Sequence, residues 1–114
     1  MESRFVKICE VSELFENEGK CFILDDETEI ALFKVNDKIY AVDNICPHNH
    51  SPVIFSGFIE RNNVTCPVHG YKFNLKTGKQ PGRAGCILRT FEVKITDNVI
   101  YVKQPEKKIF DFNF

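Results

Sequence analysis

The sequence lacks several features that would assign it at once to a common class of protein. It has no tryptophan and one methionine among 114 residues, and its formal net charge is −1, from 15 basic and 16 acidic residues. A charge this close to zero gives no reason to expect a nucleic acid or an anionic membrane as a partner. The apolar runs are four or five residues long at most, whereas a membrane-spanning helix needs roughly twenty.

A secretion signal is not expected either. Glu2, Arg4 and Lys7 are charged where a signal peptide needs its apolar segment, so we expect a cytoplasmic protein. The composition, 43% hydrophobic and 27% charged, is that of a globular domain rather than of a disordered or low-complexity chain. The length predicts a single domain over residues 1–114, and we find no internal repeat and no linker.

Short strands dominate the expected secondary structure, because apolar, β-branched and aromatic runs alternate with turn signals. We expect hairpins around Asn36-Asp37, Arg61-Asn62-Asn63 and Asp97-Asn98, and one short helix over residues 11–16 with Ser12 as its cap. This pattern is typical of an antiparallel all-β sandwich or barrel. The expected strands cover residues 5–8, 21–24, 30–35, 38–42, 57–60, 64–66, 71–75, 88–96 and 99–102.

Five cysteines and three histidines are the unusual numbers in the composition. An odd number of cysteines without a secretion signal points away from a disulfide framework and toward metal or redox chemistry. Four of these eight residues form a repeated pattern. Cys46-Pro47-His48 is followed, after seventeen intervening residues, by Cys66-Pro67-Val68-His69. Each loop offers one thiolate and one imidazole, so the two loops together can clamp a compact inorganic centre.

Two kinds of centre use two cysteines and two histidines. A structural zinc ion binds all four in a tetrahedron. A Rieske-type 2Fe-2S cluster takes the two cysteines on one iron and the two histidines on the other. Zinc sites more often pair Cys with Cys on a knuckle and His with His on a helix, and no such helix is expected here. The pattern favours the cluster, and a zinc-stabilised, non-redox interaction module remains the alternative from another class.

The spacing Cys-x-His, seventeen residues, Cys-x-x-His resembles that of the Rieske iron–sulfur family. Residues 69–79 are similar to the family's second cluster loop, and residues 89–93 to its last strands. The resemblance implies a Rieske-like antiparallel β-sandwich with a cluster-binding subdomain inserted at about residues 44–83. It also implies a 2Fe-2S cofactor with four protein ligands. In this assignment Cys46 and Cys66 bind the inner iron, and His48 and His69 bind the outer iron.

Departures from the family pattern indicate which kind of Rieske protein the sequence resembles. Rieske proteins of respiratory and photosynthetic complexes carry an extra cysteine in each loop, and the two form a disulfide. This sequence has Ser51 and Val68 at those positions. Those proteins also have a serine that donates a hydrogen bond to a sulfide, where this sequence has Tyr71. Fewer hydrogen bonds to the sulfides leave more electron density on the cluster, which lowers its potential. We therefore expect a reduction potential of about −150 to 0 mV, the lower part of the Rieske range.

The resemblance implies an electron carrier rather than an enzyme. Ring-hydroxylating oxygenases of the family need a second iron held by two histidines and a carboxylate, and once His48 and His69 bind the cluster only His50 is left. We expect the protein to pass single electrons between a reductase and a terminal oxidoreductase, such as an aromatic-ring oxygenase, as its redox partners. The alternative is the small subunit of an NAD(P)H-dependent nitrite reductase, which the compact proline loop at 80–83 also resembles.

The other cysteines and the third histidine have simpler interpretations. We expect His50 to be a solvent-exposed loop residue, because the cluster is complete with four ligands. Cys9, Cys21 and Cys86 have apolar neighbours and are expected to be buried, inert thiols.

The end of the chain and the distribution of charge leave further alternatives open. Phe110, Phe112 and Phe114 alternate with polar residues, which predicts either a strand that packs on its own domain or a docking segment. Residues 1–43 hold 5 basic and 11 acidic residues, net −6, whereas residues 44–90 hold 6 basic and 1 acidic, net +5. The basic segment either steers an acidic redox partner or consists of scattered, solvated side chains.

Overall fold

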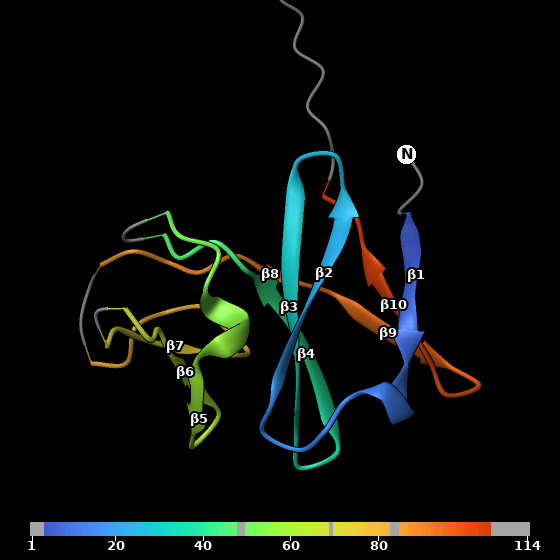
Figure 1. Cartoon of the computed structure of the whole chain (residues 1–114), viewed down its shortest axis with the longest axis horizontal. Helices are drawn as coiled ribbons and strands as arrows, with labels where there is room; N and C mark the ends of the chain where they lie inside the picture. Colours follow the sequence, from blue (N-terminus) through green and yellow to red (C-terminus); the bar gives the residue numbers. More distant parts are fainter. Residues whose placement is uncertain (1–3, 48–49, 69, 83–84, 106–114) are drawn as a thin grey trace, which may run out of the picture.

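Three antiparallel β-sheets make up the computed structural model, which describes residues 4–47, 50–68, 70–82 and 85–105 (Figure 1). The expected all-β, antiparallel fold is confirmed. In this part of the chain no helix is long and apolar enough to cross a membrane. The strands are β1 (Phe5–Glu10), β2 (Gly19–Asp25), β3 (Thr28–Val35), β4 (Lys38–Asp43), β5 (Phe58–Glu60), β6 (Asn63–Thr65), β7 (Lys72–Asn74), β8 (Thr90–Phe91), β9 (Val93–Thr96) and β10 (Val99–Lys103), and the 3-10 helices are η1 (Val11–Glu13) and η2 (Ile54–Ser56).

The sheet of β2, β3, β4 and β8 lies in the middle of the molecule (Figure 1). The sheet β1-β10-β9 lies on one side of it, and the small sheet β5-β6-β7 lies on the other. Strand β3 therefore has a core on each of its faces. Ile30 and Leu32 are buried in the core shared with the first sheet, whereas Ala31 and Phe33 are buried in the core shared with the small sheet. Since successive side chains of a strand point to opposite faces, the unbroken apolar run 30–33 is explained by burial on both sides.

Two-residue turns close the three predicted hairpins. Both central residues of each turn have positive φ: 52° and 66° at Asn36 and Asp37, 53° and 65° at Arg61 and Asn62, and 53° and 65° at Asp97 and Asn98. This is the backbone that matches the twist of the flanking strands and that Asn and Asp tolerate best. The predicted hairpins are confirmed, except that Asn63 begins β6 rather than belonging to the turn.

The predicted helix over residues 11–16 is wrong in its length and its cap. Only the 3-10 helix η1 forms there, and Glu10 caps it in place of Ser12, since the Glu10 backbone N–H donates to the Glu13 carboxylate at 3.0 Å. Leu14 then leaves the helix in an extended conformation and is buried in the core. Continuing the helix would therefore remove Leu14 from apolar contact, which costs more than one further turn of a short helix contributes.

The strand predicted over residues 88–96 is also wrong as a single element. The chain crosses here from the middle sheet to the first sheet, since β8 pairs with β4 and β9 pairs with β10. Glu92 lies between them, outside both strands. The break follows from the two pairings, because one straight strand cannot lie at the edges of two sheets.

Candidate metal centre

The two loops that carry Cys46 and Cys66 leave neighbouring sheets and meet in one core. Cys46 follows β4, and Cys66 follows β6 directly. Both cysteines are buried, with 0% and 1% of their surface exposed, in the core between the middle sheet and the small sheet. None of the five cysteines is disulfide-bonded. The predicted pair of cysteine ligands is therefore brought together, with neither side chain in a disulfide, in one core.

The two loops also share one backbone turn. In the first, the Cys46 N–H donates to the Ser51 carbonyl at 2.9 Å and the His50 N–H donates to the Cys46 carbonyl at 2.7 Å. In the second, the Cys66 N–H donates to the Tyr71 carbonyl at 2.8 Å and the Gly70 N–H donates to the Cys66 carbonyl at 2.9 Å. The same pair of backbone hydrogen bonds thus closes both loops and presents both cysteines in the same way.

The predicted ligands His48 and His69 lie outside the described residues. Among the residues that are described, no three metal-ligating side chains form a group. Two buried cysteines on matching turns can nevertheless bind one metal centre between the two loops. Thiolates are ligands both of iron–sulfur clusters and of structural zinc. The donor set of the sequence fits both centres, and the comparison with known families decides between them.

The profile of the Rieske-like [2Fe-2S] domain matches residues 4–103. The chain belongs to this family. Its cofactor is a Rieske-type 2Fe-2S cluster and its role is electron transfer, as the cysteine and histidine spacing predicted; the zinc alternative is thereby set aside. The match includes both cysteine loops and every strand from β1 to β10.

Relatives and solved structures extend over nearly the whole chain. The ferredoxin subunit of 3-phenylpropionate/cinnamic acid dioxygenase from Photorhabdus laumondii is 34% identical over 107 residues, which are 89% of this chain and 95% of that protein. The ferredoxin in a complex with the reduced oxygenase of carbazole 1,9a-dioxygenase is 26% identical, with a TM-score of 0.77 over 85% of this chain and 99% of its own. A structure assigned as the small subunit of an NADPH nitrite reductase is 27% identical, with a TM-score of 0.77 over 87% of this chain and 97% of its own.

Asp43, at the end of β4, stabilises the segment that leads into the first loop. Its side chain accepts a hydrogen bond from the Ile45 N–H at 3.0 Å and forms an ion pair with Arg89 at 3.3 Å. Its backbone N–H donates to the Arg89 carbonyl at 2.8 Å, and the Arg89 guanidinium lies 4.9 Å from the centre of the Phe91 ring. These contacts tie the segment before β8 to the strand that leads to Cys46.

The second loop is braced by its own hairpin. β6 and β7 pair on either side of it, with Thr65 opposite Lys72. After β7, the Asn74 side-chain oxygen accepts hydrogen bonds from the N–H groups of Lys76 and Thr77 at 2.9 and 3.0 Å. The loop is thus held by strand pairing before and after it and by a side-chain-stabilised turn beyond.

The remaining cysteines divide into two groups. Burial, then the nearby charge of Glu13, raises the pKa of Cys9 to about 11; burial, then the hydrogen bond and charge of Glu29, raises the pKa of Cys21 to about 12. Both thiols therefore stay protonated near neutral pH, as expected of inert cysteines. The predicted burial is confirmed for Cys9, whereas Cys21 is half-buried. For Cys86 the prediction is wrong, because this residue is exposed. It lies in the irregular segment before β8, in which Leu88 supplies the buried side chain instead.

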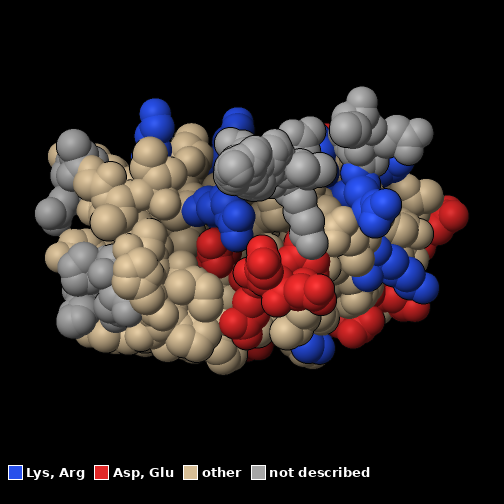
Figure 2. Space-filling model, turned by 90° about the horizontal axis from the view of Figure 1, so that it is seen from above, with Lys and Arg blue, Asp and Glu red and all other residues tan. Residues whose placement is uncertain are grey.

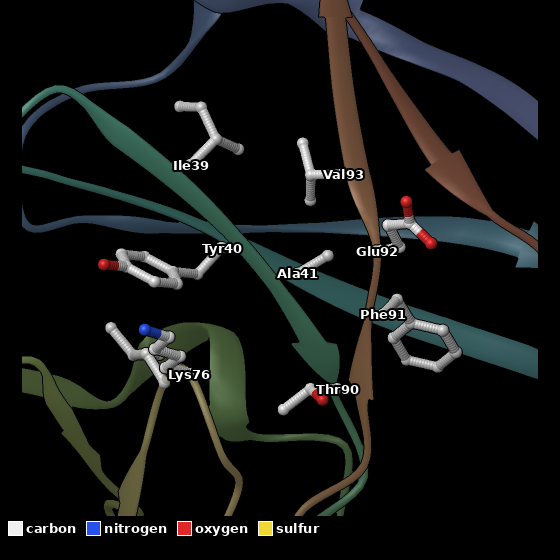
Figure 3. A pocket seen from close by; sticks show the side chains of 9 residues that line it. Ile39, Tyr40, Ala41, Lys76, Thr90, Phe91, Glu92 and Val93 are labelled. Carbon is white, nitrogen blue, oxygen red and sulfur yellow. The ribbon is translucent and has the colours of Figure 1, made fainter.

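A hollow of about 420 Å³ lies where β8 pairs with only two residues of β4 (Figure 3). Tyr40 and Lys76 lie together on one side of it, and Thr90 of β8 and Val93 of β9 line the other side (Figure 3). Its lining, drawn from the described residues, contains no cysteine or histidine. The hollow therefore adds no group that could serve as a ligand for the cluster.

Charge on the face seen from above is mixed rather than basic (Figure 2). Acidic side chains gather over its middle, lysine and arginine side chains lie on both sides of them, and the end that carries the small sheet is largely uncharged (Figure 2). A hollow next to the first loop is lined by acidic residues of the β2–β3 turn together with Ile45. On this face, lysine and arginine side chains do not form one continuous patch (Figure 2).

His50 offers a direct check on which histidines bind the cluster. It is exposed, as predicted, and takes the place of Gly70 in the matching turn, with φ of +61° against +76°. We expect His50→Gly to keep the full iron content and to change the free energy of unfolding by less than about 1 kcal/mol, since glycine adopts this backbone freely. His50→Val should lower it, because a β-branched residue tolerates positive φ less well than histidine. Denaturant unfolding and iron analysis measure both, and loss of iron in the glycine variant would make His50 a ligand.

Proposed function

We propose that the protein is the ferredoxin component of a Rieske-type chain and passes single electrons from a reductase to a terminal oxygenase. The observation that carries the proposal is the pair of matching turns, each of which buries one cysteine in a shared core. Relatives that match almost end to end are ferredoxin subunits of dioxygenases. The Rieske domain takes up residues 4–103 of the 114, so the greater part of this chain is devoted to the cluster and its support.

We propose Cys46, His48, Cys66 and His69 as the four ligands. When bound, the cluster supplies reversible one-electron exchange at its irons. The burial of the two thiols favours the cysteines as ligands of the inner iron. The small sheet β5-β6-β7 falls entirely within residues 44–83, which supports that range as the cluster-binding subdomain.

Freshly purified protein is expected to be red-brown and to contain about two irons and two acid-labile sulfides per chain. Redox titration should give a midpoint potential of about −150 to 0 mV, because Tyr71 stands where high-potential relatives place a serine hydroxyl. A colourless protein that holds one zinc would contradict the proposal, and a positive potential would contradict the inference drawn from Tyr71.

The nitrite reductase small subunit remains the second candidate, because one structure at 27% identity carries that assignment. The two roles differ in the electron acceptor. A reconstituted assay should therefore offer the reduced protein to the oxygenase component of a dioxygenase and, in parallel, to the large subunit of an NAD(P)H-dependent nitrite reductase. Stimulated turnover of the oxygenase alone is the expected result, and stimulation of the nitrite reductase alone would reverse the assignment.

A further inference from the structure

Asn44 is a fully buried polar residue two positions before Cys46, with 0% of its surface exposed. Its side-chain NH2 donates to the Pro52 carbonyl at 3.3 Å and to the Cys21 sulfur at 3.4 Å. Its side-chain oxygen accepts a hydrogen bond from the Phe55 N–H at 2.7 Å. A buried amide with both its donor and acceptor groups paired stabilises one arrangement of the groups around it.

The backbone of Asn44 joins the same parts of the molecule. Its N–H donates to the Glu29 carbonyl at 2.9 Å, and its own carbonyl accepts from the Ile54 N–H at 3.1 Å. One residue therefore connects the middle sheet with the end of the first loop, at Pro52 and in η2. Since the Ser51 carbonyl accepts the Cys46 N–H, fixing Pro52 also fixes the acceptor that orients Cys46.

The second loop shows why the first needs such a residue. Strands β6 and β7 pair immediately on either side of the second loop, and the position two residues before Cys66 is the apolar Val64. After the first loop the chain enters η2, and within the described residues no strand returns directly from that loop to pair with β4. The hydrogen bonds of the Asn44 side chain thus hold the end of the first loop in place, as the pairing of β6 with β7 does for the second loop.

Cys21 and Glu29 continue the hydrogen-bond chain that begins at the Asn44 side-chain NH2. The Cys21 thiol donates to the Glu29 carboxylate at 3.0 Å and accepts from Asn44. The raised pKa of Cys21 keeps this thiol neutral and able to donate. Both residues belong to the β2–β3 pair, so Asn44 is anchored to the antiparallel pairing of the middle sheet.

We propose that Asn44 is a positioning residue for the iron–sulfur cluster. It fixes the end of the first loop relative to the sheet, and thereby the direction from which the Cys46 thiolate reaches the iron. This inference rests on the proposed ligand role of Cys46. Groups around the ligands of a metal centre tune its electronic properties and its retention, and their loss typically costs about 10- to 100-fold in metal affinity or activity.

The test uses Asn44→Ala, Asn44→Asp and, as a control, Val102→Ala, which removes fully buried methyl groups from the other core. The EPR spectrum of the reduced cluster, its reduction potential and the rate of iron release to a chelator are measured on the loaded proteins. We expect shifted g values and potential in both Asn44 variants, with iron release about 10-fold faster. Val102→Ala should lower the unfolding temperature yet keep the wild-type spectrum and potential.

Two further comparisons keep the result decisive. Asn44→Asp retains the acceptor for Phe55 and replaces the two N–H donors by at most one O–H, because a buried carboxyl takes up a proton. It is the second variant on which the proposal is tested where Asn44→Ala does not fold. Cys21→Ser keeps an acceptor for the Asn44 amide and should retain the wild-type spectrum. A wild-type EPR spectrum, potential and release rate in Asn44→Asp would overturn the proposal. Absence of iron from the wild-type protein would instead contradict the proposed function.

Discussion

Replacing Cys66 by alanine is expected to remove the cluster, with the iron content falling from about two atoms per chain to near zero. Cys66 is 1% exposed and faces the same core as Cys46, so no solvent-exposed side chain can take its place without rearranging that core. In the proposed ligand set, one remaining cysteine cannot supply both thiolate ligands of the inner iron. Iron and sulfide analysis together with the visible absorption spectrum measures the loss, and Cys46→Ala should give the same result.

Two other cysteines serve as matched controls for this prediction. Cys9 is also buried, at 5% exposed, but lies in the core on the other side of the middle sheet. Cys9→Ala should therefore lower the free energy of unfolding and keep the iron. Cys86 is exposed, and Cys86→Ala should change neither. Full iron content in Cys66→Ala, or its loss from Cys9→Ala, would show that the ligand set is assigned to the wrong thiols.

The sequence predicts those parts of the site that depend only on residues close together in the chain. A cysteine and a histidine two or three positions apart in a loop identify a metal-binding segment without any knowledge of the fold. Hairpin turns such as Asn36-Asp37 are predicted for a similar reason, because the residues that accept positive φ are few. Both signals depend only on neighbours along the chain.

What sequence reasoning missed depends on contacts between distant segments. Asn44 stands beside an apolar strand, and its three side-chain partners belong to β2, to the first loop and to η2. No periodicity brings those partners together. An uncharged polar residue at the buried end of a strand was the available signal. The burial expected for Cys86 failed likewise, because Leu88 fills the core from that segment and leaves Cys86 at the surface.

Gly78→Ala is expected to lower the free energy of unfolding by about 3 kcal/mol or more, a large effect for the addition of one methyl group. Gly78 has φ of +78°, and a Cβ at this position would lie far inside van der Waals contact of the Leu88 carbonyl oxygen. Left-handed backbone costs a non-glycine residue about 1–2 kcal/mol, and forcing atoms into a filled space costs about 1–3 kcal/mol more.

The consequence should extend to the second loop. The Gly78 carbonyl accepts the Leu88 N–H at 2.8 Å, and the Gly78 N–H donates to the Asn74 carbonyl at 2.7 Å. Moving the two chain segments apart breaks the first bond and loosens the turn that follows β7. We therefore expect the unfolding temperature of the loaded protein to fall by about 12 °C or more, since 1 kcal/mol corresponds to about 4–8 °C in a domain of this size.

Gly82→Ala separates backbone strain from steric overlap. Gly82 has φ of +73°, close to that of Gly78, but a Cβ there would meet no atom of the described residues within 4 Å. Its alanine variant should lose only about 1 kcal/mol, or about 4–8 °C. Thermal unfolding followed by circular dichroism compares the two variants directly. Equal decreases in unfolding temperature would mean that the close approach of Gly78 to Leu88 does not stabilise the turn after the second loop. A decrease that is several degrees larger in Gly78→Ala than in Gly82→Ala is the expected result, and it assigns this stabilisation to the contact between Gly78 and Leu88.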